Sequence, residues 1–145
     1  MITAPFFSSA EEVEVAFYDA LARADLEAMM AVWAEDDEPV CIHPGGPRLH
    51  GLPAIRDAWR QLFASGTRLR IRLTDLLVQE SPMFIVRNLI EELSVEDIAG
   101  QAPNVVLATN IYASGPQGWR MVLHHASPMP MSAPPARDDA PHTLH

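Results

Sequence analysis

The spacing of apolar residues changes near Gly66, and this change constrains the fold more than any other feature of the chain. Before it, apolar residues recur every three or four positions, which is typical of helices with one buried face. After it, apolar residues alternate with polar ones, which is the period of a half-buried strand. The helical stripe that comes first comprises Val13, Phe17, Ala20, Leu21 and Ala24, and the first alternating set comprises Leu69, Ile71 and Leu73.

Three helices are predicted in the first part of the chain. Ser9 followed by Glu12 has the spacing of a capping box, so the first helix is expected to begin there. Asp25 suits the N-cap of a second helix, whose apolar side extends to Trp33. Pro53 suits the first turn of a third helix, because its missing N–H donor is not needed there.

Short strands separated by compact turns are predicted after the helices, with one earlier strand before a Pro/Gly turn at 44–47. Short connections favour antiparallel neighbours. Helices followed by a run of strands predict an α+β fold with the helices packed on one face of a sheet. We expect one domain over residues 1–128 and a flexible Pro-rich tail over 129–145. The predicted strands are 40–42, 69–73, 83–95, 104–113 and 119–125.

Charge and composition exclude several classes of function. The formal net charge of −9 over 145 residues disfavours binding to nucleic acid and to anionic membranes. The chain has one cysteine, Cys41, so an internal disulfide is not expected. No apolar stretch is long enough to cross a membrane, and the N-terminus does not read as a signal peptide, so we expect a cytoplasmic protein.

The segment 41–51 (CIHPGGPRLHG) concentrates the groups with the most chemistry. His43 can transfer protons or bind a metal near neutral pH. Cys41 lies two residues before it on the same strand face, so a thiolate activated by His43 is one hypothesis. Arg48 follows the turn and is expected either to clamp a carboxylate or to lie in solvent.

Four segments together resemble the nuclear transport factor 2-like superfamily, particularly its SnoaL-like and ketosteroid-isomerase-like members. The segments are 32–37 (VWAEDD), 47–51 (PRLHG), 51–56 (GLPAIR) and the closing strand 118–125 (GWRMVLHH). The resemblance implies a curved, antiparallel-rich sheet wrapped by three N-terminal helices into a cone with an apolar interior, as in cystatin-like α+β folds. It also implies dimerisation through the sheet. Relatives include isomerases, dehydratases, cyclases and inert assembly domains, so the fold alone does not assign an activity.

The resemblance assigns roles to three residues. His43 takes the place of the catalytic base in the family's Asp-Pro pair. Trp59 takes a pocket-lining aromatic position on the third helix, and His124 a pocket-lining position on the last strand. His124 and His125 are neighbours on a strand and must face opposite sides.

Two other positions of the ketosteroid isomerase pattern are not kept. Its oxyanion-hole tyrosine falls at Phe17, which has no hydroxyl, and its partner acid falls near Leu107 or Thr109. Tyr18 is adjacent to Phe17 but is expected to point elsewhere, because successive helical residues are about 100° apart. Steroid isomerisation by that mechanism is therefore not expected.

We predict a small-molecule-binding domain with an apolar pocket that contains His43 as catalytic base or acid and His124 as its partner. His50 is an uncertain third imidazole, which leaves a metal site as an open alternative, although no metal or cofactor is expected. The alternative function is a non-catalytic dimeric accessory or assembly domain. The residues predicted to contact ligand are Phe17, Trp33, Cys41, Trp59, Phe63 and Asn110.

Polar residues in the predicted strands leave two orientations open. Asn88 and Asn110 could each face the interior and orient a ligand there. The three arginines Arg68, Arg70 and Arg72 share one strand face. We expect that face to be a solvated or dimer-facing sheet surface. Its expected acidic partners are Glu91, Glu92 or Glu80.

Overall fold

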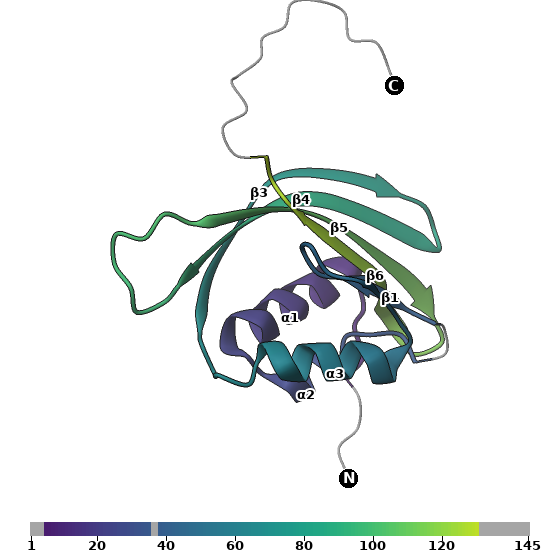
Figure 1. The fold of residues 1–145 in the computed structure, drawn as a ribbon. Coiled ribbons are helices and arrows are strands. Elements are labelled where there is room, and N and C mark those ends of the chain that lie inside the picture. The colour runs from purple at the N-terminus through teal and green to yellow at the C-terminus, as the bar shows by residue number, and fades with distance from the viewer. Residues whose placement is uncertain (1–4, 36–37, 131–145) are drawn as a thin grey trace, which may run out of the picture.

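The computed structural model describes residues 5–35 and 38–130, in which a curved sheet arches over a layer of helices (Figure 1). The helices are α1 (Ala10–Arg23), α2 (Leu26–Met30) and α3 (Leu52–Leu62). The strands are β1 (Val40–Ile42), β2 (Arg48–His50), β3 (Leu69–Glu80), β4 (Phe84–Val95), β5 (Asn104–Gly115) and β6 (Gly118–Pro128). The predicted α+β class is therefore confirmed.

The six strands form one sheet in the order β2-β1-β6-β5-β4-β3. Strands β3 to β6 form an antiparallel meander, as the short connections predict. The sequence analysis missed β2, which pairs with β1 after the Pro/Gly turn, and it missed the parallel pairing of β1 with β6. That parallel pairing sets Cys41 opposite His124 and so brings the His43 segment to the last strand.

Side-chain caps begin the first two helices as predicted. The Ser9 hydroxyl accepts a hydrogen bond from the backbone N–H of Glu12, and the Asp25 carboxylate accepts one from the N–H of Ala28. The Glu12 carboxylate differs slightly from the capping-box pattern, because it accepts from the backbone and hydroxyl of Ser8. Each cap satisfies an N–H group that the helix itself leaves unpaired.

The extension of the second helix to Trp33 was wrong, since α2 ends at Met30. Trp33 instead forms an isolated parallel bridge with Met121 of β6. The N–H of Met121 donates to the carbonyl of Val32, and the N–H of Ala34 donates to the carbonyl of Met121. These bonds to the sheet replace the helical bonds that the apolar spacing predicted, because backbone groups are satisfied equally well by either partner.

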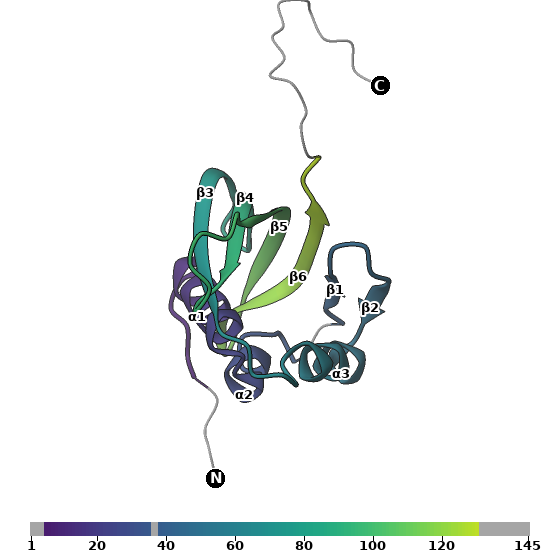
Figure 2. The same cartoon turned by 60° about the vertical axis from the view of Figure 1, so that its left-hand side comes forward.

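Two bulges bend the sheet around the helices (Figure 2). One lies in β3 between Thr74 and Leu77, where Asp75 has a positive φ of 55°. The other lies between β5 and β6 at Ile111 and Tyr112. An extra residue in one strand increases the local twist, so the sheet becomes concave toward α1. No helix of the described residues covers the convex face.

The register between β3 and β4 shows which acidic residues lie opposite the arginine-rich face of β3. Arg72 lies opposite Glu92, as predicted for one of the acidic partners, whereas Glu91 lies opposite Leu73. Glu91 therefore faces the concave side of the sheet, where it is 3% exposed. Arg70 donates to the backbone carbonyl of Glu96.

Backbone pairing continues just past β6, because the N–H of Met129 donates to the carbonyl of Val105. The prediction of a flexible tail falls, from residue 131 onward, outside the described residues. Among the described helices, none has the length and hydropathy of a membrane span.

Candidate functional site

A cavity of about 440 Å³ opens between α3, the turn after β1 and the concave side of the sheet. Its walls are mostly apolar and aromatic. Trp59 of α3 and Phe63, the C-cap residue directly after α3, have ring centroids 5.4 Å apart. The lining residues are Leu21, His43, Pro44, Trp59, Leu62, Phe63, Ser65, Thr67, Leu69, Glu91, Leu93, Asn104, Val106, His124 and Ala126.

His43 and His124 both line this cavity, with ring centroids 6.5 Å apart. The rings of His43 and Trp59 make an edge contact with their centroids 4.5 Å apart, which holds the His43 imidazole against α3. Burial lowers the pKa of both histidines, that of His124 to about 3. Both imidazoles are therefore neutral near neutral pH. His125 is exposed on the other side of β6, as strand alternation predicts.

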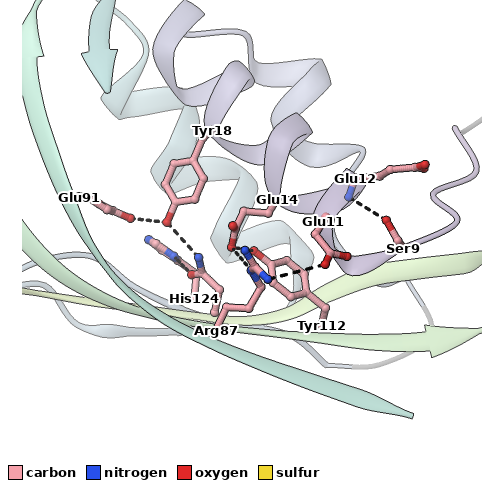
Figure 3. A network of polar contacts seen from close by, with 10 residues as sticks. Ser9, Glu11, Glu12, Glu14, Tyr18, Arg87, Glu91, Tyr112 and His124 are labelled. Carbon is pink, nitrogen blue, oxygen red and sulfur yellow. Dashed lines mark hydrogen bonds and ion pairs between the residues drawn. The ribbon is translucent and has the colours of Figure 1, made fainter. Parts of the chain in front are cut away.

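A buried chain of hydrogen bonds, the polar chain, runs behind the cavity (Figure 3). It leads from Glu91 through Tyr18 and Asn110 to His124. The Tyr18 hydroxyl donates to Oε2 of Glu91 at 2.6 Å. Nδ2 of Asn110 donates to the Tyr18 oxygen at 2.9 Å, and Oδ1 of Asn110 lies 2.6 Å from Nδ1 of His124. Tyr18 does not line the cavity, but its hydroxyl takes part in this buried chain because the sheet curves around α1.

The direction of the polar chain determines the tautomer of His124. Tyr18 has one hydroxyl proton, which it gives to Glu91, so its oxygen can only accept from Asn110. The amide group of Asn110 then presents its oxygen to His124. An oxygen acceptor requires a proton on Nδ1 of His124, so the neutral ring keeps an unprotonated Nε2.

Among the lining residues that the sequence analysis did not predict, Glu91 is the one that ionises. Burial raises the pKa of its carboxyl to about 7, and the hydrogen bond from Tyr18 partly opposes this rise. Among the described residues, Oε1 of Glu91 has no hydrogen-bond partner. The available signal was the alternation of Leu89, Glu91 and Leu93, which puts a carboxylate on the buried face of a strand.

A second buried cluster joins Glu14, Arg87 and Tyr112 beside the polar chain (Figure 3). Oε1 of Glu14 accepts from Nε of Arg87 and from the hydroxyl of Tyr112, both at 3.0 Å. The guanidinium of Arg87 is thus paired with Glu14, not with Glu91. The ion pair joins α1 to β4, and the hydrogen bond from Tyr112 joins α1 to β5.

The predicted ligand contacts divide into two groups. Trp59 and Phe63 line the cavity, whereas the other four predicted residues do not. Phe17 lies behind the wall, with its ring 5.8 Å from that of Trp59 and 4.8 Å from that of His124. The remaining three are Trp33, buried against β6, Cys41, behind His43, and Asn110, behind His124.

The structure does not favour the two other chemistries that the His43 segment raised. Sγ of Cys41 lies 3.7 Å from Nε2 of His43, but burial raises the pKa of the thiol to about 12, so it stays protonated. Arg48 is exposed at the start of β2 and does not line the cavity.

The residues that a metal site would need are not brought together. Nε2 of His50 contacts Oε1 of Glu38 at 2.7 Å on the surface. No group of three histidine, cysteine or acidic side chains with a geometry suited to a metal ion occurs within 5–35 and 38–130.

The family model for the SnoaL-like domain matches residues 11–132, and the chain belongs to this family, within the nuclear transport factor 2-like superfamily. One similar solved structure is a candidate calcium/calmodulin-dependent protein kinase type II association domain from Thiobacillus denitrificans. It is 40% identical to this chain with a TM-score of 0.80, and the match covers 87% of this chain and 99% of that one. A candidate dehydratase of the NTF2-like family from Streptomyces avermitilis is 25% identical with a TM-score of 0.72, covering 81% and 91%.

A ketosteroid isomerase-like protein from Erwinia carotovora atroseptica shares the fold, with 18% identity, a TM-score of 0.66 and coverage of 83% of this chain and 93% of that one. No match was found among curated proteins. These similarities define a SnoaL-like domain of the nuclear transport factor 2-like superfamily.

Proposed function

We propose that this protein binds a small, largely apolar molecule in the cavity and supports proton transfer on it, of isomerase or lyase type. The observation that carries the proposal is the convergence of His43 and His124, from separate segments, on one apolar cavity of about 440 Å³. Concave, mostly apolar sites with a few polar groups are typical of small-molecule binding.

The cavity contains groups suited to acid–base chemistry. His43 is held neutral and is in the form that accepts a proton, for instance from a carbon next to a carbonyl group. His124 presents Nε2 as an acceptor that orients a ligand N–H or O–H. The carboxyl of Glu91, with its pKa near 7, is able to take up or release a proton at neutral pH.

A ligand screen by thermal shift tests this function. Apolar carbonyl compounds and alcohols should raise the Tm of the wild type, and the shift should fall in His43→Ala. His125→Ala is the matched control, because it removes an exposed imidazole from the opposite face of β6 and should leave the shift unchanged. Equal shifts in wild type and His43→Ala, or no stabilising compound at all, would remove the support for a site at His43.

The second candidate function is a non-catalytic domain that assembles as a homodimer through the convex face of the sheet. Large apolar side chains are exposed there without a covering helix in the described part of the chain, including Leu77 (65% exposed), Phe84 (51%) and Leu107 (36%). Exposed apolar patches of this kind favour protein association. The similarity to a candidate association domain also supports assembly.

Sedimentation velocity of wild type, Leu77→Lys and Val15→Lys tests the dimer. Val15 is 71% exposed on α1, away from the convex face, and serves as the matched control. We expect a dimer for wild type and Val15→Lys and weaker association for Leu77→Lys. A monomeric wild type, or equal association of all three proteins, would count against assembly through this face.

A further inference from the structure

The cavity lining can carry negative charge but not positive charge near neutral pH. Of the described side chains that line it, none is a lysine or arginine, and the two imidazoles are neutral. Glu91 is the lining residue that can carry a full charge near neutral pH, and this charge is negative. The net charge of −9 for the whole chain adds a field of the same sign.

The carboxylate of Glu91 is incompletely paired. Oε2 accepts from Tyr18, whereas Oε1 has no hydrogen-bond partner in the described part of the chain and is not one of its fully buried atoms, although the residue as a whole is only 3% exposed. The buried cation on the same strand, Arg87, is already bonded to Glu14. A buried carboxylate with one hydrogen bond and no counter-ion is costly, so an incoming donor, and most of all a cation, would stabilise it.

The aromatic walls are also suited to a cation. Trp59 and Phe63 stand on the helix side of the same cavity. Aromatic faces attract ammonium groups through their quadrupoles, and the effect strengthens when the group is removed from water. The remainder of the wall is apolar and would cover a hydrocarbon body.

We propose that the ligand is an apolar molecule that carries a protonated amine, and that Glu91 binds the ammonium group through Oε1. The inference rests on the proposed function, because it names the class of molecule that the cavity takes. A ligand carboxylate is disfavoured by the same geometry, since it would meet Glu91 without a compensating cation.

Three probes that differ in their polar group test the proposal: phenethylamine, phenethyl alcohol and hydrocinnamate. Their Kd values are measured by ¹H–¹⁵N NMR titration at about pH 8, where the amine is protonated and a carboxyl like that of Glu91 is mostly ionised. We expect the amine to bind about 10-fold more tightly than the alcohol, because charge-assisted hydrogen bonds are roughly twice as strong as neutral ones. The acid should bind most weakly.

Glu91→Gln should reduce the preference for the amine to within about 3-fold while keeping the affinity for the alcohol, since glutamine retains an oxygen acceptor. Glu92→Gln is the matched control, because it removes the same charge from the opposite face of β4 and should keep the preference. Alcohol binding without an amine preference, or an amine preference that survives in Glu91→Gln, would overturn the inference alone. If none of the three probes binds the wild type, the proposed function fails with it.

Discussion

Glu91→Gln should become more stable relative to the wild type as the pH rises. The wild-type carboxyl has a pKa of about 7 in the folded protein, against an ordinary value of 4.5. Between these values the folded state holds a proton that the unfolded state has lost. The contribution of this carboxyl to the stability of the wild type therefore falls as the pH rises from 4.5 to about 7. Glutamine does not ionise, so the variant has no such loss.

The magnitude follows from the width of the window. One pH unit within it is worth about 1.4 kcal/mol, so the full window contributes about 3 kcal/mol. The free energy of unfolding of Glu91→Gln minus that of wild type should thus increase by about 3 kcal/mol between about pH 4.5 and about pH 8. The contribution of His124 is present in both proteins and cancels in this difference.

Urea denaturation at a series of pH values measures the difference directly. Glu92→Gln on the opposite face of β4 controls for the change in net charge. A difference for Glu91→Gln that stays constant with pH, or that decreases as the pH rises, would refute the burial argument for this carboxyl.

Three further predictions rest on neighbouring contacts. In the Glu91→Gln background, His124 should lower the stability by about 3 kcal/mol from about pH 7 to about pH 4.5, because the unfolded chain takes up a proton that His124 does not bind while folded. Adding His124→Asn should remove this part of the loss in urea denaturation and leave the part that comes from His43, whose pKa burial also lowers; an unchanged loss would contradict the burial of His124. Tyr18→Phe should raise the pKa of Glu91 further, because it removes a hydrogen bond that lowers this pKa. The pKa is measured by ¹³C NMR titration of the carboxyl, and an unchanged value would contradict the prediction. Leu89→Ala should cost about 2–5 kcal/mol, since Leu89 is 1% exposed, whereas Leu62→Ala at a 55% exposed site should cost far less; similar losses in the two variants would contradict the assignment of the core.

Most of the secondary structure could be predicted from local patterns. The N-caps at Ser9 and Asp25, Pro53 at the start of α3, and the alternation in the strands all depend on residues close in the sequence. The exceptions are the end of α2, the strand β2 and the part of β3 beyond residue 73, because each depends on backbone bonds to another strand. Propensity and periodicity do not report such partners.

Only part of the candidate site was predictable. The structure brings together at one cavity His43, Trp59 and His124, to which the resemblance assigned roles, and Phe63 lines it as well. Phe17, Cys41 and Asn110 were expected to touch ligand but lie one layer behind, and Trp33 lies away from the cavity. Which residues form the inner layer depends on the curvature of the sheet, which the bulges in β3 and β5–β6 produce.

Local patterns are sufficient to predict the α+β class, the caps, the strand alternation and the opposite faces of His124 and His125, since these follow from spacing along the chain. The polar chain, in contrast, depends on contacts between distant segments. Tyr18 and Glu91 are 73 residues apart, and Tyr18 and Asn110 are 92 apart. Their hydrogen bonds, the burial that raises the pKa of Glu91 and the resulting tautomer of His124 exist only because the curved sheet closes around α1.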